Sequence, residues 1–239
     1  MRPFPASFNI REITTNGTTL HVRVGGRGPA VLLLHGFGDT GDMWEPLAST
    51  LVADHTVIVP DLRGMGLSAR PVDGYDKKTQ GRDIAGLLDA LQIERVDLVT
   101  HDIGNMVGFA FAMEAPARVH RLILIDAPLP GIGPWDEITR DHKLWHFSFW
   151  GPDEERLVQG RERIYLDRFW NELSANPQNV PEATRAHSLR CMRVRARCTQ
   201  HSNSSRHSTR MRPTTRCSRR SVGSPCQFWQ LAPRSRSVR

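Results

Sequence analysis

Short apolar runs alternate with segments of helical periodicity along the first half of the chain. Four runs are apolar enough to predict strands buried on both faces, as in a parallel sheet: residues 31–34, 56–59, 96–99 and 122–125. Between them, residues 42–53 predict a helix, and residues 79–92 place Ile and Leu at an i, i+3, i+4, i+7 spacing, which is one helical face. The alternation indicates an α/β class with a mostly parallel, doubly wound sheet.

The pattern differs on either side of this alternating part. Before it, residues 8–24 predict a β-hairpin around the Asn16-Gly17 turn. After it, residues 130–190 predict helices rich in Trp and Phe, in which Leu166, Phe169, Trp170 and Leu173 share one apolar face. A helical insertion that follows half of an α/β sheet favours a cap over the carboxyl ends of the strands. The domains expected are therefore a core of residues 1–129 and a cap of residues 130–189.

Charge and cysteine content set residues 190–239 apart from both domains. This segment holds 13 arginines and no Asp or Glu, whereas the preceding residues carry 19 basic against 25 acidic side chains. The net charge of +7 therefore averages a mildly acidic chain and a strongly basic tail. All four cysteines also lie in the tail, at spacings that match no usual zinc pattern, so no metal site is expected.

Three glycine-containing turns follow neighbouring predicted strands, at residues 35–38, 61–66 and 101–104. The carboxyl edge of an open α/β sheet is where ligands bind. Asp102 stands in a small–x–nucleophile–x–small pattern, which is typical of a nucleophile elbow, although Thr100 occupies a place where Gly is usual. Asp also suits the N-cap of the following helix. The three turns together favour the elbow.

At these motifs the chain resembles the α/β-hydrolase family, in particular its epoxide hydrolase and dehalogenase branch, whose nucleophile is Asp. The resemblance covers residues 8–189 and rests on HGFGDTGDMW, DLRGMGLS, HDIG, LILIDAPLP and WHFSFW…GRERIYLDRFW. It implies an α/β-hydrolase fold with a helical cap, and no cofactor or metal. It also implies a small organic substrate.

The resemblance assigns a role to several side chains. Asp102 would attack a substrate carbon and form an ester, and the backbone N–H groups of Phe37 and Ile103 would form the oxyanion hole. A His would then activate water, oriented by a carboxylate, for which Asp126 is the candidate. Asp126 also suits a cap of the turn before Pro128.

Differences between this chain and the haloacetate-cleaving members of the branch indicate the substrate class. Haloacetate-cleaving members carry Arg where this chain has Ile103 and Met106, and their halide cradle uses a His-Trp pair where this chain has His146-Phe147. Both departures favour an uncharged epoxide, with a dehalogenase as the alternative. Tyr165 is the candidate proton donor for the leaving oxygen or a packing residue, and Arg168 stands where one subgroup has His.

The C-terminal part departs from the family most. Two further strands, a helix and the catalytic His are expected after the cap, but residues 190–239 show almost no apolar periodicity, and His201 and His207 follow no strand. A shifted reading frame near position 188 is the favoured interpretation, ahead of a disordered tail and a folded binding module. A function of another class also stays open, namely binding of polyanions through the tail, with nucleic acid disfavoured by the scarcity of aromatic residues.

The sequence predicts neither an N-terminal signal segment nor a membrane-spanning helix. The first ten residues lack a charged-then-apolar signal, and no apolar run approaches the ~18 residues of a membrane helix. A cytoplasmic location is the expectation.

Overall fold

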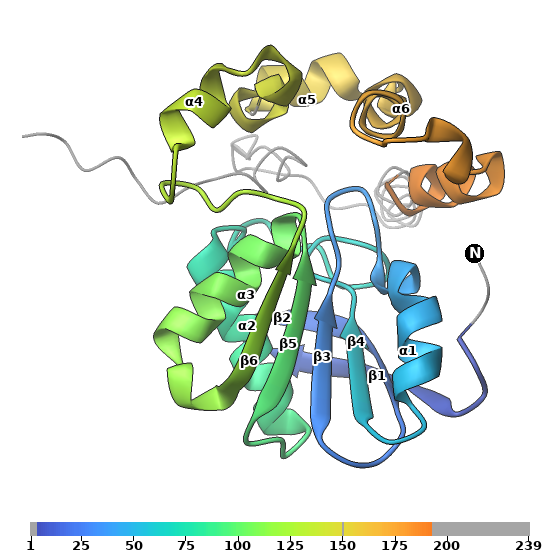
Figure 1. The fold of residues 1–239 in the computed structure, drawn as a ribbon, viewed down its shortest axis with the longest axis vertical. Helices are drawn as coiled ribbons and strands as arrows, with labels where there is room; N and C mark the ends of the chain where they lie inside the picture. Colours follow the sequence, from blue (N-terminus) through green and yellow to red (C-terminus); the bar gives the residue numbers. More distant parts are fainter. Residues whose placement is uncertain (1–3, 150, 193–239) are drawn as a thin grey trace, which may run out of the picture.

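The computed structural model describes residues 4–149 and 151–192. A six-stranded sheet in the order β1-β2-β4-β3-β5-β6 forms its centre (Figure 1). The strands are β1 (Phe8–Thr15), β2 (Thr18–Gly25), β3 (Ala30–Leu34), β4 (Thr56–Pro60), β5 (Val96–His101) and β6 (Val119–Ile125). The interpretations of residues 193–239, whether as a frame-shifted tail or a polyanion-binding segment, lie outside the described residues.

The predicted hairpin and the predicted parallel strands are both confirmed. β1 pairs antiparallel with β2 through a two-residue turn, in which Asn16 and Gly17 have φ of 42° and 74°, as a type I′ turn requires. β4, β3, β5 and β6 are mutually parallel, and β3 lies between β4 and β5. The side chains of β3 after Ala30 are buried, which explains why this stretch is apolar throughout.

Helices cover both faces of the sheet, so the doubly wound arrangement is also confirmed. α2 (Lys77–Ala90) and α3 (Ile103–Glu114) lie together on one face, and α1 (Glu45–Leu51) lies on the other (Figure 1). Each face has its own apolar cluster. The first includes Ile84 and Phe111 from α2 and α3, and the second is built around Trp44 and Ala48.

The helix expected at residues 42–53 is shorter and divided. A 3-10 turn, η1 (Gly41–Trp44), precedes α1, and Thr40 caps that turn by accepting a hydrogen bond from the Asp42 N–H. Pro46 lies in the first turn of α1, where its missing N–H leaves no bond unmade. A further 3-10 turn, η2 (Pro116–Arg118), connects α3 to β6.

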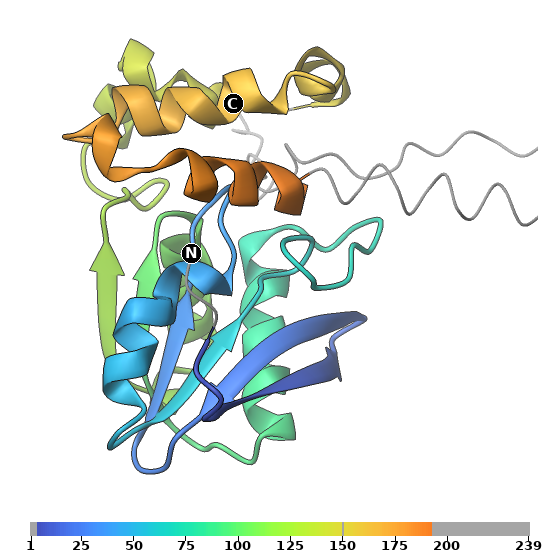
Figure 2. The same ribbon diagram turned by 90° about the vertical axis from the view of Figure 1, so that its right-hand side faces the viewer.

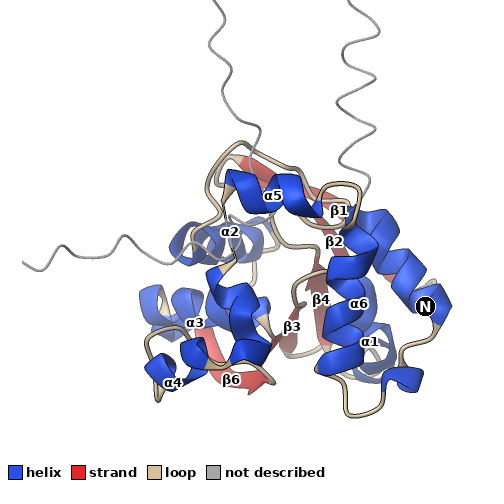
Figure 3. Cartoon of the chain, turned by 90° about the horizontal axis from the view of Figure 1, so that it is seen from above, coloured by secondary structure: helices blue, strands red, loops and turns tan. Residues whose placement is uncertain are grey.

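The segment after β6 is helical, as expected, and lies beyond the carboxyl ends of the strands (Figures 1 and 2). It consists of α4 (Trp135–Arg140), η3 (His142–Ser148), α5 (Pro152–Val158), α6 (Glu162–Glu172), η4 (Pro177–Asn179) and a helical run over residues 182–192. Seen from above, α4 overlies the α3 side of the sheet and α6 overlies the α1 side (Figure 3). The expected apolar face of α6 is buried only in part, since Leu166 is buried while Leu173 is 43% exposed.

β6 is the last strand of the sheet in the part of the chain that the structure describes. Ile123, Leu124 and Ile125 are 50%, 40% and 37% exposed, so both faces of this edge strand carry uncovered apolar side chains. Among the described residues no helix is both long and apolar enough to cross a bilayer.

Candidate active site

A buried ionic network holds the first two predicted turns together. Asp61, directly after β4, accepts hydrogen bonds from Arg23 Nη1 and the Gly41 N–H at 2.8 Å, and from the Leu67 N–H at 2.9 Å. Burial alone would raise the pKa of this carboxyl, but Arg23 and these donors lower it overall. Asp61 is therefore ionised and fixes the turns rather than facing substrate.

His35 stabilises the first turn through hydrogen bonds between its ring and the backbone. Its Nε2 accepts the Leu62 N–H at 2.9 Å, which leaves Nδ1 to donate to the Gly36 carbonyl at 2.9 Å. Burial lowers the pKa of His35, so the ring is neutral at neutral pH. Both ring nitrogens have backbone partners, and this His is unsuited to act as a base.

Asp102 lies at a strained turn between β5 and α3. Its φ and ψ are 50° and −119°, a conformation that non-glycine residues rarely adopt. The turn packs closely on the first turn of the site, because a Cβ added to Gly36 would lie 3.0 Å from the Asp102 Cβ. The Asp102 side chain makes no capping hydrogen bond to α3. Instead its Oδ2 accepts the Phe37 N–H at 2.8 Å.

Burial dominates the electrostatics of Asp102. Desolvation raises the pKa of its carboxyl, against the opposing effects of the Phe37 N–H, His101, the Ile103 N–H and Lys77. Asp39 belongs to the same cluster. Burial first, and then repulsion from Asp102 and Asp42, raise the pKa of Asp39 to about 7.

Polar side chains behind the turn connect it to β6. Thr100 Oγ1 lies 2.7 Å from Asn105 Oδ1, and Asn105 Nδ2 donates to the carbonyls of Ile125 and Ala127 at 2.9 and 3.2 Å. Thr100 therefore has a structural use at the place where the elbow pattern usually has Gly. The Asp102 N–H also bonds to the Ile125 carbonyl at 3.2 Å.

Asp126 ends β6 beside this turn. It follows Ile125, the register partner of His101, and has a φ of 51°. Its side chain is exposed, and no hydrogen bond to it is found within the described residues. The structure therefore brings Asp126 to the same sheet edge as Asp102 but provides no histidine for it to orient in the described part of the chain.

Aromatic side chains of the helical segment after β6 cover the turn that contains Phe37. The Phe37 ring lies 6.2 Å from the Tyr165 ring and 5.7 Å from that of Phe169, measured between centroids. His146 is buried among them, stacked on Phe147 at 4.7 Å. Burial and then the charge of Arg168 lower the pKa of His146 to about 4. Tyr165 and His146 thus lie in the cap near Phe37, and His146 is neutral.

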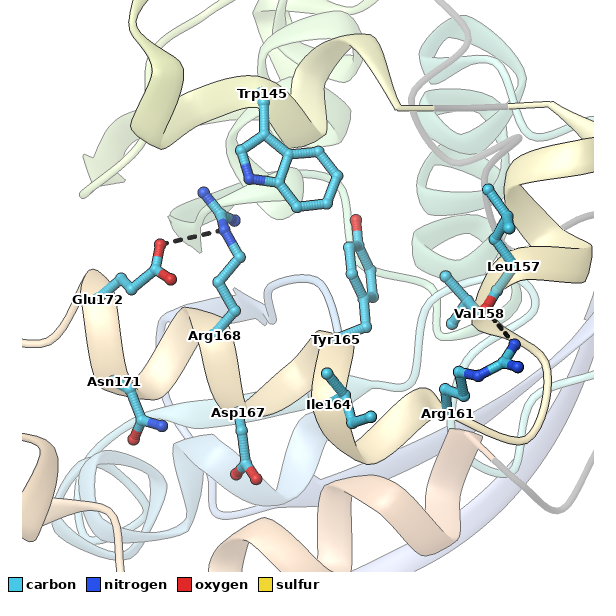
Figure 4. Close-up of a pocket in the computed structure, with 10 residues that line it drawn as sticks. All are labelled: Trp145, Leu157, Val158, Arg161, Ile164, Tyr165, Asp167, Arg168, Asn171 and Glu172. Atoms are coloured by element: carbon cyan, nitrogen blue, oxygen red, sulfur yellow. Dashed lines mark hydrogen bonds and ion pairs between the residues drawn. The ribbon is translucent and has the colours of Figure 1, made fainter.

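A cavity of about 570 Å³ lies within the cap beyond Tyr165. Figure 4 shows Tyr165, Trp145 and Arg168 on its wall, with the Arg168 guanidinium beside the Trp145 ring, while Asp167 points to the opposite side of α6. The Arg168 guanidinium lies 4.7 Å from the Trp145 ring centroid and pairs with Glu172 at 3.2 Å. The pocket is therefore mainly apolar and aromatic, and its central cation is already paired.

Two charged residues at the site were absent from the sequence-based candidates. Asp39 lies within the HGFGDTGDMW motif, two residues after Phe37, so its position was a usable signal. Lys77 begins α2, far from every recognised motif, and nothing in the sequence pattern indicates it. Among the described residues no cluster of three or more potential metal ligands is found.

Comparison with known proteins agrees with this architecture. A family profile described as "alpha/beta hydrolase fold" matches residues 29–236. The chain belongs to the α/β-hydrolase family. Its relatives of modest identity include epoxide hydrolases and a fluoroacetate dehalogenase, the branch that the resemblance implied.

Curated relatives in this family have modest identity. A soluble epoxide hydrolase of Corynebacterium sp. (strain C12) is 32% identical over 187 residues, which cover 73% of this chain and 65% of that protein. A fluoroacetate dehalogenase of Burkholderia sp. is 35% identical over 149 residues, or 59% of this chain and 49% of that protein. The chain thus spans less than two thirds of the length of either relative.

Solved structures show the same fold. Cfl2 from Burkholderia cenocepacia superposes with a TM-score of 0.68 at 32% identity, covering 83% of this chain and 74% of that one. The epoxide hydrolase CorEH superposes with a TM-score of 0.69 at 29% identity, with the same coverage of both chains.

Proposed function

We propose that the site opens small uncharged epoxides by nucleophilic attack of Asp102. An Asp102 carboxylate oxygen forms a bond to a ring carbon, and the ring C–O bond breaks. The released oxygen takes a proton from a cap donor, for which Tyr165 is the candidate. The product is a hydroxyalkyl ester on Asp102. When water attacks this ester, the N–H groups of Phe37 and Ile103 stabilise the oxyanion of the tetrahedral intermediate.

One observation carries this proposal. Asp102 Oδ2 lies 2.8 Å from the Phe37 nitrogen, at an elbow with φ of 50° that directs the carboxylate toward the cap side of the sheet. A capping Asp would instead accept a hydrogen bond from the second or third residue of α3, Gly104 or Asn105, and Asp102 makes no such bond. Strain of this kind persists where surrounding structure enforces it, which occurs mostly at functional sites.

An uncharged substrate fits the surroundings of Asp102 better than an anion. Ile103 and Met106, in the first turn of α3, are both buried and apolar. They offer no cation to pair with a substrate carboxylate, and an unpaired buried charge is costly. This supports an epoxide over a haloacetate as substrate.

Hydrolysis of the ester needs a base that the described residues do not provide. No histidine there hydrogen-bonds to Asp102 or Asp126, and His35 is used by the backbone of two turns. General-base help is typically worth ~10²–10⁴-fold in rate. We therefore expect the ester to form once and to accumulate.

Intact-mass measurement after incubation with styrene oxide tests the proposal. We expect the chain to gain the mass of one styrene oxide, and the Asp102→Asn variant to gain none, because an amide is a poor nucleophile. Asp97→Asn, on the preceding strand β5 and paired at the surface with His120 and Arg121, is the matched control and should react like the parent.

Two results would count against the proposed chemistry. Equal labelling of the parent and Asp102→Asn would show that the nucleophile lies elsewhere. Release of chloride from chloroacetate, with formation of a carboxymethyl ester on Asp102 and no reaction with styrene oxide, would favour a dehalogenase instead.

A further inference from the structure

The ammonium group of Lys77 is buried, which is rare for a lysine. It is the first residue of α2, after the N-cap Asp76, and its Nζ has neither solvent contact nor a hydrogen-bond partner in the described part of the chain. The next residue, Lys78, is an ordinary surface lysine that pairs with Glu114 at 3.1 Å. Buried ammonium groups are normally paired, so the position of Lys77 requires an explanation.

The charges that act on Lys77 come from two elements. Asp76 belongs to the N-terminus of α2 itself, and Asp102 belongs to the turn that begins α3, the helix packed beside α2. Burial lowers the pKa of Lys77 to about 7, although Asp102 and then Asp76 act to raise it. In the other direction, Lys77 lowers the pKa of Asp102, as His101 also does.

A purely structural role does not account for this arrangement. An aliphatic side chain of similar length would fill the same space without desolvating an ammonium group. Lys77 lowers the pKa of both Asp76 and Asp102. Asp76 already uses its carboxylate as the N-cap of α2, where it accepts the Thr79 N–H at 2.8 Å, so Asp102 is the one of the two that lies at the site. Perturbed ionisable pairs of this kind are concentrated at functional sites.

We propose that Lys77 is a positioning residue for the Asp102 nucleophile: its ammonium group supplies the positive charge that keeps the buried carboxylate ionised and able to attack. This rests on the proposed function of Asp102. Lys77 itself forms no bond to substrate. The attack therefore needs Asp102 deprotonated, in a cluster whose other titratable members are Lys77, Asp39, Asp76 and His101.

The pH dependence of ester formation separates this role from a structural one. In the parent, the labelling rate by styrene oxide should rise with pH as Asp102 loses its proton and then level off, because only the carboxylate attacks. Lys77→Met should move this rise to higher pH, because it removes a cation that lowers the pKa of Asp102. Lys77→Arg keeps a cation at this place and should leave the rise near its parent position. Lys78→Met should match the parent.

A direct titration provides a second measurement that needs no reaction. The chain has three lysines, at positions 77, 78 and 143, so lysine labelled with ¹³C gives a simple spectrum in which the Cε shift reports each amine. In Asp102→Asn the pKa of Lys77 should fall below its parent value, because an attractive charge is removed, while that of Lys78 stays unchanged. Circular dichroism verifies that each variant is folded.

The failures can be told apart. If the parent forms no adduct at Asp102, the proposed function fails and this inference fails with it. If the parent forms the adduct but the labelling rate of Lys77→Met rises at the same pH as that of Lys78→Met, the inference alone is overturned. An Asp102→Asn variant that leaves the titration of Lys77 unchanged also overturns it.

Discussion

At the scale of single residues, the site depends on buried charges whose partners come from distant parts of the chain. Asp61 joins β4 to Arg23 of β2 and to two loop amides, while Asp102 accepts an amide hydrogen from the loop after β3. The free-energy cost of desolvating the charge is offset differently for the two carboxylates. Asp61 has a full ionic partner and a lowered pKa, whereas Asp102 has weaker donors and a raised one.

Replacement of Asp61 by Asn should destabilise the fold by about 3 kcal/mol, because it leaves Arg23 short of a buried partner. Asp153→Asn removes an exposed pair with Arg156 and should change stability by less than about 1 kcal/mol. The folded pKa of Asp61 is lowered, so its contribution is present above the unfolded value near 3.8 and is lost as pH falls through the folded value. Urea unfolding at neutral pH and at about pH 3 measures this. An equal loss for both variants would contradict it.

The sequence predicted the elements of the core and the turns of the site for the same physical reason. Buried parallel strands must be apolar throughout, and a turn as tight as that of Asp102 needs small neighbours such as Gly104, whose added Cβ would lie 2.7 Å from the Leu34 carbonyl. Both requirements can be recognised in the local amino-acid sequence. The role open to Lys77 has no such signal in the sequence, because its burial and the effect of Asp102 on its pKa arise only when α2 packs beside α3.

At the scale of elements, β6 is an edge of the sheet among the strands that the structure describes. Ile123, Leu124 and Ile125 present exposed apolar side chains on both faces of this edge strand. β1 forms the opposite edge, where Ile10 is 65% exposed but lies between Asn9 and Arg11. The two edges therefore differ in how strongly they favour pairing with another chain.

Self-association should follow from β6 and not from β1. Light scattering at increasing concentration should show growth of large species in the parent, and Ile123→Lys should reduce it, since a charge on an edge strand opposes pairing. Ile10→Lys is the matched control and should leave association unchanged. A parent that remains monomeric throughout, with one sharp thermal transition, would disprove this prediction.

At the scale of the whole molecule, the cap and the core meet through a few aromatic contacts. Phe169 of α6 lies 5.7 Å from Phe37 and 4.9 Å from His146. The last described helical run is tied to the core separately, by His187 Nε2 at 3.1 Å from Asp42. Phe169 of the cap therefore contacts Phe37, the residue whose N–H donates to Asp102.

Loosening the contact between Phe169 and Phe37 should weaken substrate binding without unfolding the core. Phe169→Ala should raise the styrene oxide concentration needed for half-maximal labelling by about tenfold, because small misplacements of a covering element are costly. Trp170→Ala is the control, since Trp170 contacts Arg185 within the cap at 5.4 Å. Similar labelling curves for the two variants would show that the cap does not position the substrate.

The nucleophilic role of Asp102 is tested most directly by locating the bound epoxide. After incubation of the full chain with styrene oxide, digestion and tandem mass spectrometry identify the modified side chain. The account predicts a single hydroxyalkyl ester on Asp102, which mild hydroxylamine removes. An adduct on His101, Lys77 or Cys191 with Asp102 unmodified would contradict it.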